Sequence, residues 1–305
     1  MTNDAVMRLG YLAPRTLLPP LRAIADLKRI RSARRKGSIA ERLFGSAWAQ
    51  IASGRSVADV ARVTLRDALA ATRLGDLDPS TLAVVGVPIG QAQDIWRSAA
   101  REAAGPLNFA EQVWIDNSPL QDDASMPSFV ARLADQPRAG ATCPSLGRLV
   151  LEPPESHADH CFAVAIFGVI LAPTWDARAD MVFLAALAHH LHNALLPDSG
   201  FAGEVLLGEW LEPAMANATM HALAELPHPV RAKVEAARSI LPDAETPEGR
   251  AFHAADTLDR VLQVEHYLRA AGTSMDFVLR RMELVHAGPV KPFQDAVLEA
   301  MGLAA

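Results

Sequence analysis

The chain carries three histidines within four residues, in the stretch AHHLHN at residues 188–193, and an apolar run leads into them. Buried imidazoles lose hydration and need polar partners, so an apolar helix that ends in such a cluster indicates a functional site. If the helix continues through the cluster, His189, His192 and Asn193 share one face and His190 lies about 100° round the axis.

Two other polar stretches are candidates to converge on this cluster. The first is ESHADH at residues 155–160, in which Ser156 and Asp159 have the spacing of a helix-capping box and His160 lies in the first turns. The second is AADTLD at residues 254–259, within a long helix that begins near Pro247. The chain therefore presents, in order, an early histidine, a central histidine pair and a late aspartate.

This order resembles the HD superfamily of metal-dependent phosphohydrolases, in particular its 5′-deoxynucleotidase-like branch. That branch reads roughly E-S-V-A-E-H, then L-L-H-D, then E-T-P-E-A-R…A-D-K-L-E…L-L-Q. This chain has ETPEGR at residues 245–250, ADTLD at 255–259 and VLQ at 261–263, which form the most specific part of the match. The resemblance covers about residues 148–270 and departs at the central pair, where His189-His190 replaces His-Asp.

The resemblance implies a divalent transition metal held by side chains from three separate helices. The positions that match the family's ligands are His160, His189 and Asp256, and His190 stands where the family has an aspartate. Three imidazoles and one carboxylate suit Mn, Fe, Co, Ni or Zn. In such a site the metal polarises a phosphoryl oxygen and lowers the pKa of a bound water.

The resemblance also places the residues around the metal. Asn193 stands where the branch has a glutamate that acts near the leaving group, and an amide cannot transfer that proton. Asp198 matches a second important acid, and Arg148 is the candidate for the substrate-contacting arginine. Thr257 replaces the lysine that usually follows the last ligand. Four other histidines, His192, His221, His228 and His253, are expected to be structural or exposed, and His253 is able to support Asp256. His157 is expected to be exposed near the helix cap.

Three functions follow from these matches and departures. The first is hydrolysis of a nucleotide or another small phosphate ester. The second is a catalytically degenerate domain that binds a ligand or partner without turnover, which the substitutions at His190 and Asn193 favour. The third is a di-iron oxygenase, for which His221 and His228 are the candidate extra ligands.

Composition favours an all-α protein with a large core. Of its 305 residues, 50% are hydrophobic and 6% aromatic, and alanine and leucine dominate. Two cysteines are too few for a disulfide framework, so a reducing, cytoplasmic setting is expected. The longest apolar run, residues 161–173, is too short to span a bilayer and indicates a core helix, so no transmembrane segment is expected.

Charge is distributed unevenly along the chain. Residues 1–55 hold eleven Lys and Arg against three carboxylates, a balance of +8, so with a net charge of −6 the remaining 250 residues carry −14. A basic run, Lys28–Lys36, is expected to form the far end of a helix that passes through Ile30 and stops at Gly37. It is interpreted either as a solvated helix end or as a contact for an anionic partner.

Turn-forming residues divide the chain into three parts. Residues 1–115 form a smaller helical N-terminal module of unknown role, residues 116–147 a connector, and residues 148–305 the HD-like metal-binding helical domain. The sequence does not determine which metal is bound or which substrate is used. A homodimer is expected from the resemblance alone.

Overall fold

The computed structural model describes residues 14–105, 107, 125–144, 146–271 and 274–304. Within these ranges the chain forms helices joined by turns and isolated β-bridges, with no strand, so the predicted all-α class is confirmed. The helices are α2 (Pro14–Asp26), α3 (Ile39–Ala52), α4 (Val57–Leu74), α5 (Pro79–Val84), α6 (Ile89–Ala104), α8 (Ser128–Asp135), α9 (His157–Leu171), α10 (Ala179–Ala188), α11 (Gly200–Leu207), α12 (Leu211–Leu223), α13 (His228–Arg238), α14 (Pro247–Ala271) and α15 (Lys291–Ala300).

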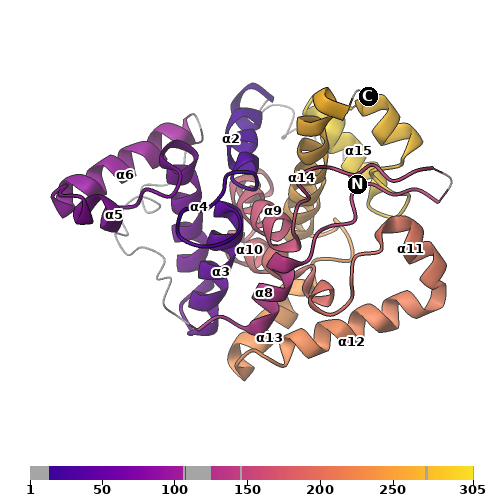
Figure 1. The fold of residues 1–305 in the computed structure, drawn as a ribbon. Coiled ribbons are helices and arrows are strands. Elements are labelled where there is room, and N and C mark those ends of the chain that lie inside the picture. The colour runs from indigo at the N-terminus through magenta and orange to yellow at the C-terminus, as the bar shows by residue number, and fades with distance from the viewer. Residues whose placement is uncertain (1–13, 106, 108–124, 145, 272–273, 305) are drawn as a thin grey trace.

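Helices α9 and α10 form the centre of the bundle, with α3 and α4 on one side and α14 on the other (Figure 1). Helix α9 is buried on all sides, as expected of a helix that is apolar all round. The predicted capping box of Ser156 and Asp159 is present at its start. At Gly168 an added Cβ would lie 2.6 Å from Val182 Cγ1, so the missing side chain lets α10 approach α9 closely.

The segment His157–Trp175 is long and apolar enough to cross a membrane by length and composition alone. However, 89% of its most apolar window is buried inside the protein. Its apolar side chains therefore face other helices, and the segment is the core helix that the sequence predicts.

The N-terminal helices share one hydrophobic core with the C-terminal half. Leu21 of α2, together with Phe44 and Trp48 of α3, belongs to the same buried cluster as Phe162 of α9. Helix α8 packs beneath α3, where the Phe129 ring meets Trp48 edge-on at 4.9 Å between centroids. The division into an N-terminal module, connector and C-terminal domain stays a prediction, and residues 116–124 of the connector lie outside the described residues.

The basic run after α2 is not a helix end, so that interpretation is wrong. Helix α2 ends at Asp26, and the turn that follows directs Lys28 into the protein, where it is 7% exposed. Farther along, Arg34 pairs with Asp78 beside the end of α4. Arg31 and Lys36 are exposed, so the anionic partner stays a prediction for these two side chains.

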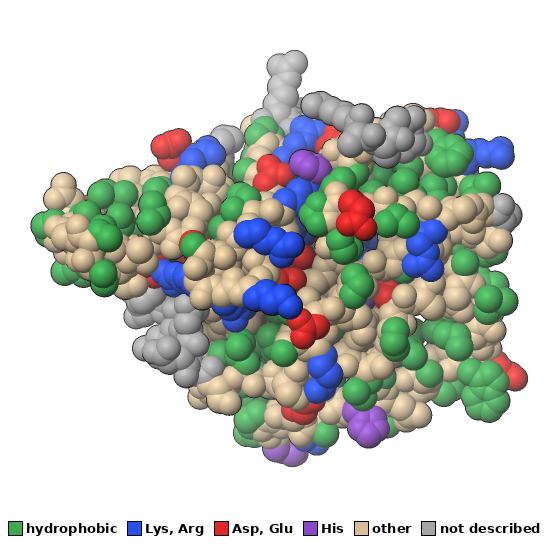
Figure 2. Space-filling model, in the orientation of Figure 1, with side chains coloured by type: hydrophobic (Ala, Val, Ile, Leu, Met, Phe, Trp, Pro, Cys, Tyr) green, Lys and Arg blue, Asp and Glu red, His purple; other side chains and the backbone are tan. Residues whose placement is uncertain are grey.

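Helices α5 and α6 project as a lobe on the side of the molecule away from α14. Apolar side chains gather on this lobe, among them Val84, Val85 and Ile89, which are 87%, 71% and 55% exposed (Figure 2). The lobe lies far from α9 and α14, which carry the polar cluster of the next subsection, so it takes no direct part in positioning that cluster.

Candidate metal centre

Three side chains from three helical segments meet at the ends of α9 and α10. His160 lies in the second turn of α9, His189 directly follows α10, and Asp256 lies on α14. The Nε2 atom of His160 is 3.1 Å from His189 Nε2 and 3.2 Å from Asp256 Oδ1. His189 Nε2 lies 4.0 Å from the same carboxylate oxygen. The structure therefore brings these three predicted ligands together.

The helix does not continue through the histidine cluster, contrary to the expectation from the sequence. Helix α10 ends at Ala188, and a 3₁₀ turn, Leu191–Ala194, follows. His189 Nδ1 lies 2.6 Å from the Ala186 carbonyl oxygen, and the Arg238 guanidinium donates a hydrogen bond to the Ala188 carbonyl oxygen. Side chains therefore satisfy carbonyl oxygens that the end of the helix leaves without backbone donors.

Because the helix ends there, His190 is not turned away from the site. Its ring centroid lies 4.2 Å from that of His189 and 5.2 Å from that of His160. One nitrogen from each of these three histidines lies within 4.8 Å of the others. His190 Nδ1 is 2.8 Å from Asn193 Oδ1, an acceptor, so His190 donates through Nδ1 and has Nε2 free.

The tautomer of His160 is determined by Asp259, one turn after Asp256 on α14. Asp259 Oδ2 lies 2.7 Å from His160 Nδ1. Burial alone would raise the pKa of Asp259, but the charge of Lys28 and the hydrogen bond from His160 lower it to about 2. An ionised carboxylate only accepts hydrogen bonds, so Nδ1 of His160 donates to Asp259 and its Nε2 is the nitrogen turned toward His189 and Asp256.

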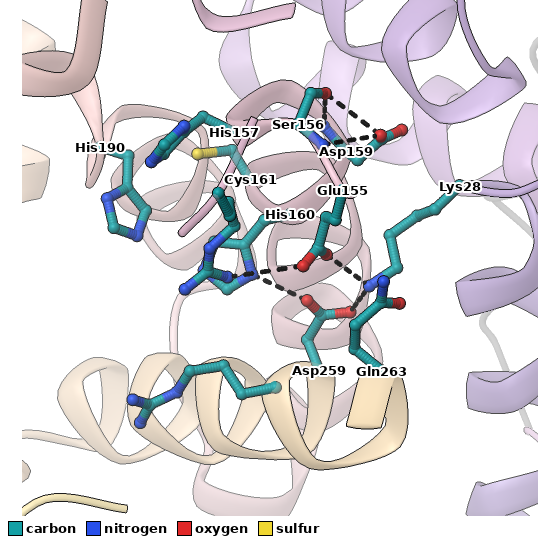
Figure 3. Close-up of polar contacts among 12 residues, drawn as sticks. Lys28, Glu155, Ser156, His157, Asp159, His160, Cys161, His190, Asp259 and Gln263 are labelled. Carbon is teal, nitrogen blue, oxygen red and sulfur yellow. Dashed lines mark hydrogen bonds and ion pairs between the residues drawn. The ribbon is translucent and has the colours of Figure 1, made fainter. Parts of the chain in front are cut away.

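Glu155 and Asp259 form a second candidate ligand cluster with His160 (Figure 3). Ligand atoms of Glu155, His160 and Asp259 also lie within 4.8 Å of one another. However, Lys28 Nζ is 2.7 Å from both Glu155 Oε1 and Asp259 Oδ1. This position already holds a cation in the form of the lysine ammonium, so the histidine side is the candidate position for a metal.

The donor atoms around His160 and His189 fit one divalent ion. Both histidines donate through Nδ1, so their Nε2 atoms are the nitrogens that face each other and the Asp256 carboxylate. Two ligands about 2.1 Å from one ion lie about 3 Å apart at a right angle and about 4.2 Å apart when opposite. The spacings of 3.1, 3.2 and 4.0 Å fall at or within these limits. A divalent cation between the three atoms would replace the hydrogen bonds that join these groups.

Burial and neighbouring charges favour the metal-binding protonation states of three candidate ligands, His189, His190 and Asp256. Burial lowers the pKa of His189 and of His190 well below its usual value, and the adjacent histidines lower both further. Burial alone would raise the pKa of Asp256, but Arg260 and His160 hold it well below its ordinary value. Neutral imidazoles and an ionised carboxylate are the metal-binding forms of these groups.

A cavity of about 880 Å³ opens beside the centre, within the size range of small-molecule sites. His189, His190 and Asp256 form part of its wall. Its other polar lining includes Arg138, Asp198, Glu204, Arg238, Arg260 and His253. A ligand in this cavity therefore has access both to the proposed metal and to several guanidinium groups.

The other predicted site residues lie in different places. Asp198 lines the cavity and accepts hydrogen bonds from the Ala139 and Gly200 backbone N–H groups at 2.9 and 2.8 Å. Asn193 is buried behind His190, and its amide donates to the Leu196 carbonyl oxygen at 3.0 Å.

Arg148, the predicted substrate-contacting arginine, does not line the cavity. Its side chain is exposed and donates to the Ala139 carbonyl oxygen at 3.0 Å. Arg138, which lies in the extended segment after α8, lines the cavity instead. Its Nη1 atom is 3.8 Å from Glu155 Oε2, and a bridge between Pro137 and Ser156 ties this segment to the start of α9.

The remaining histidines separate into two groups. His157 was expected near the surface but is fully buried, with Nε2 3.6 Å from Asp198 Oδ2, and burial lowers its pKa to about 3. His192 and His253 line the cavity. His221 on α12 and His228 at the start of α13 are exposed and do not reach the centre. The oxygenase alternative therefore loses the two histidines that were its candidate extra ligands.

Three residues that support the centre were not predicted to lie near it from the sequence: Lys28, Arg138 and Asp259. Asp259 could have been found, because residues three apart on a helix share a face and Asp256 was already a candidate. Lys28 and Arg138 lie far from the motif in the chain, and only the folded arrangement places them beside it.

Comparison with known families supports the resemblance to the HD superfamily. Residues 130–292, more than half of the chain, match the family model described as HD domain. This span includes His160, His189, His190 and Asp256. The chain matches no curated protein and no solved structure.

Proposed function

The chain belongs to the HD-domain family, and from this premise we propose that it is a metal-dependent phosphohydrolase acting on a nucleotide or another small phosphate ester. The observation that carries the proposal is the meeting of two imidazole Nε2 atoms and the Asp256 carboxylate within 4.0 Å, at the wall of a cavity lined by arginines. Both cysteines are buried free thiols, and a cytoplasmic setting is part of the proposal.

The residues of the centre have separate roles in this proposal. His160, His189, His190 and Asp256 hold the ion, which when bound supplies Lewis acidity and a water of lowered pKa. Arg138 binds phosphoryl oxygens through its guanidinium, a geometry suited to phosphate.

Two further residues shape the cavity in this proposal. Asp198, held ionised mainly by the N–H groups of Ala139 and Gly200, accepts a hydrogen bond from a substrate hydroxyl. Asn193 orients His190 and, as an amide, has no proton to transfer to a leaving group.

A second candidate is a domain that binds a phosphorylated ligand without hydrolysing it. The observation that favours it is the pair His190 and Asn193, which stand where a bridging carboxylate and a carboxylic acid are expected. Their mutual hydrogen bond of 2.8 Å engages both side chains with each other. The two candidates share the same cavity and differ only in turnover.

The test is a phosphate-release screen on purified protein. The panel contains ribonucleoside and deoxynucleoside monophosphates and sugar phosphates, each with Mn, Fe, Co, Ni or Zn and again with a chelator. We expect at least one ester to be hydrolysed only in the presence of metal, and ordinary deoxynucleoside monophosphates to be weak substrates. Saturable binding of an ester without release under any metal would contradict hydrolysis and support the second candidate.

Replacement of Arg138 by Gln should weaken substrate binding, since it removes a charged hydrogen-bond donor from the cavity wall. A hydrogen bond to a charged group contributes about 1.5–3 kcal/mol, so KM should rise about 10- to 100-fold. Arg148→Gln is the matched control, because Arg148 lies on the same loop but outside the cavity. Steady-state kinetics measure both variants. Equal KM values in both would contradict a substrate-binding role for Arg138.

A further inference from the structure

Lys28 is a buried cation contributed by the N-terminal part of the chain, outside the matched family span. Its side chain is 1% exposed, and its Nζ lies 2.7 Å from Glu155 Oε1 and 2.7 Å from Asp259 Oδ1 (Figure 3). Burial alone would lower the pKa of Lys28, but the charges of Asp259 and Glu155 raise it, so the ammonium stays protonated. A buried charge of this kind is costly unless its partners are fixed in place.

A continuous line of contacts joins Lys28 to the proposed metal. One oxygen of Asp259 accepts from Lys28 Nζ, and the other accepts from His160 Nδ1 at 2.7 Å. The two oxygens of one carboxylate are thus divided between the lysine and the histidine. Fixing one oxygen fixes the other, and the Nδ1 contact determines that His160 presents Nε2 to His189 and Asp256.

Lys28 also separates two buried carboxylates. Glu155 and Asp259 both point at its Nζ atom, and no other cation among the described residues is as close to either. Without the ammonium, two like charges would face each other in a buried space, and rotation of the Asp259 carboxylate away from Glu155 would relieve their repulsion. Such a rotation moves Oδ2 away from His160 Nδ1, its hydrogen-bond donor.

We propose that Lys28 is a positioning residue of the metal centre, which holds Asp259 so that His160 keeps Nε2 free for the ion. The effect of Lys28 on metal binding rests on the proposed function. The effect of Lys28 on the tautomer of His160 does not. In this account the segment after α2 completes a centre whose ligands all lie within residues 130–292.

The chain offers a matched control for a merely structural role. Arg22 of α2 donates two hydrogen bonds, of 3.0 and 2.8 Å, to Glu265 of α14. This exposed pair joins the same two segments as Lys28 and Asp259 but does not touch His160. Arg22→Met therefore removes a link between α2 and α14 without altering the line to the metal.

The test compares Lys28→Met with Arg22→Met in metal-free protein and during titration with Mn²⁺. Nitrogen NMR of the histidine rings should report protonated Nδ1 for His160 in the wild type and in Arg22→Met, and a mixture of tautomers in Lys28→Met. Calorimetry should show a 10- to 100-fold weaker Kd for Lys28→Met, the usual effect of losing an outer-shell partner of a ligand. Arg22→Met should stay within twofold of the wild type.

A double variant distinguishes action through Asp259 from a separate effect. If Lys28 acts through that carboxylate, Lys28→Met should weaken Mn²⁺ binding in the wild type but add little in an Asp259→Asn background. Lys28→Gln, which keeps a donor without the charge, replaces Lys28→Met if the latter does not fold, and at least a fivefold loss is expected. An unchanged His160 tautomer together with a Kd equal to that of Arg22→Met would overturn the proposal. A wild type that binds none of Mn, Fe, Co, Ni and Zn would contradict the proposed function, while the NMR comparison would still decide the role of Lys28.

Discussion

Asp256→Ala should abolish both metal retention and phosphate release. Asp256 is the one carboxylate among the four proposed ligands, so its loss removes the only negative ligand charge that would offset the ion. We expect activity to fall by at least about 10³-fold, since metal-assisted water activation is lost altogether. Thermal stability in saturating metal should fall as well, because a ligand present at 100 times its Kd stabilises the native state by about 2.7 kcal/mol. Metal analysis, phosphate release and thermal unfolding measure the three effects.

Asp295→Ala on α15 is the control for this variant. Asp295 is also a helical aspartate with a cationic partner, Lys291 at 2.8 Å, but it is exposed and remote from the cavity lining. It should retain metal, activity and metal-dependent stabilisation. An Asp256→Ala protein that keeps its metal and its turnover would show that the ion, if bound, lies elsewhere.

The combined variant His190→Asp and Asn193→Glu should raise the hydrolysis of deoxynucleoside monophosphates. The aspartate restores a carboxylate able to bridge metals, and the glutamate restores a group that can protonate the leaving oxygen. Aspartate is shorter than the imidazole it replaces, so it opens space through which the longer glutamate side chain reaches the cavity. General acid–base assistance contributes about 10²- to 10⁴-fold, which a phosphate-release assay resolves easily.

The single variants identify which departure matters. His190→Asp alone tests the ligand, and Asn193→Glu alone tests the proton donor, which in that variant remains behind the imidazole. Vigorous turnover by the wild type that falls in His190→Asp would contradict the interpretation of His190 as a departure from the catalytic arrangement. His190 would then be the working ligand of a different chemistry.

The parts of the centre that the sequence predicted are those governed by local rules. The capping box at Ser156 fixes the start of α9 and hence the depth of His160 in the bundle. The all-round apolar character of α9 predicts that its histidine is brought into a core. Asp256 follows from the motif and from the long helix that Pro247 begins.

The parts that could not be predicted depend on contacts between distant segments. The end of α10 at Ala188 coincides with Arg238, fifty residues away, donating to the Ala188 carbonyl oxygen. The inward turn of Lys28 depends on Glu155 and Asp259, which periodicity along α2 does not reveal. For Arg138 and Arg148, only the path of the loop determines which guanidinium enters the cavity.

Metal content of the wild-type protein, purified without chelator, is the most direct measurement of the central claim. Two imidazole Nε2 atoms and a carboxylate that lie within 4.0 Å of one another predict about one divalent transition-metal ion per chain. We also expect thermal stabilisation of the metal-free protein by at least one of Mn, Fe, Co, Ni and Zn. Wild-type protein that retains no metal and is stabilised by none of these five ions would contradict it.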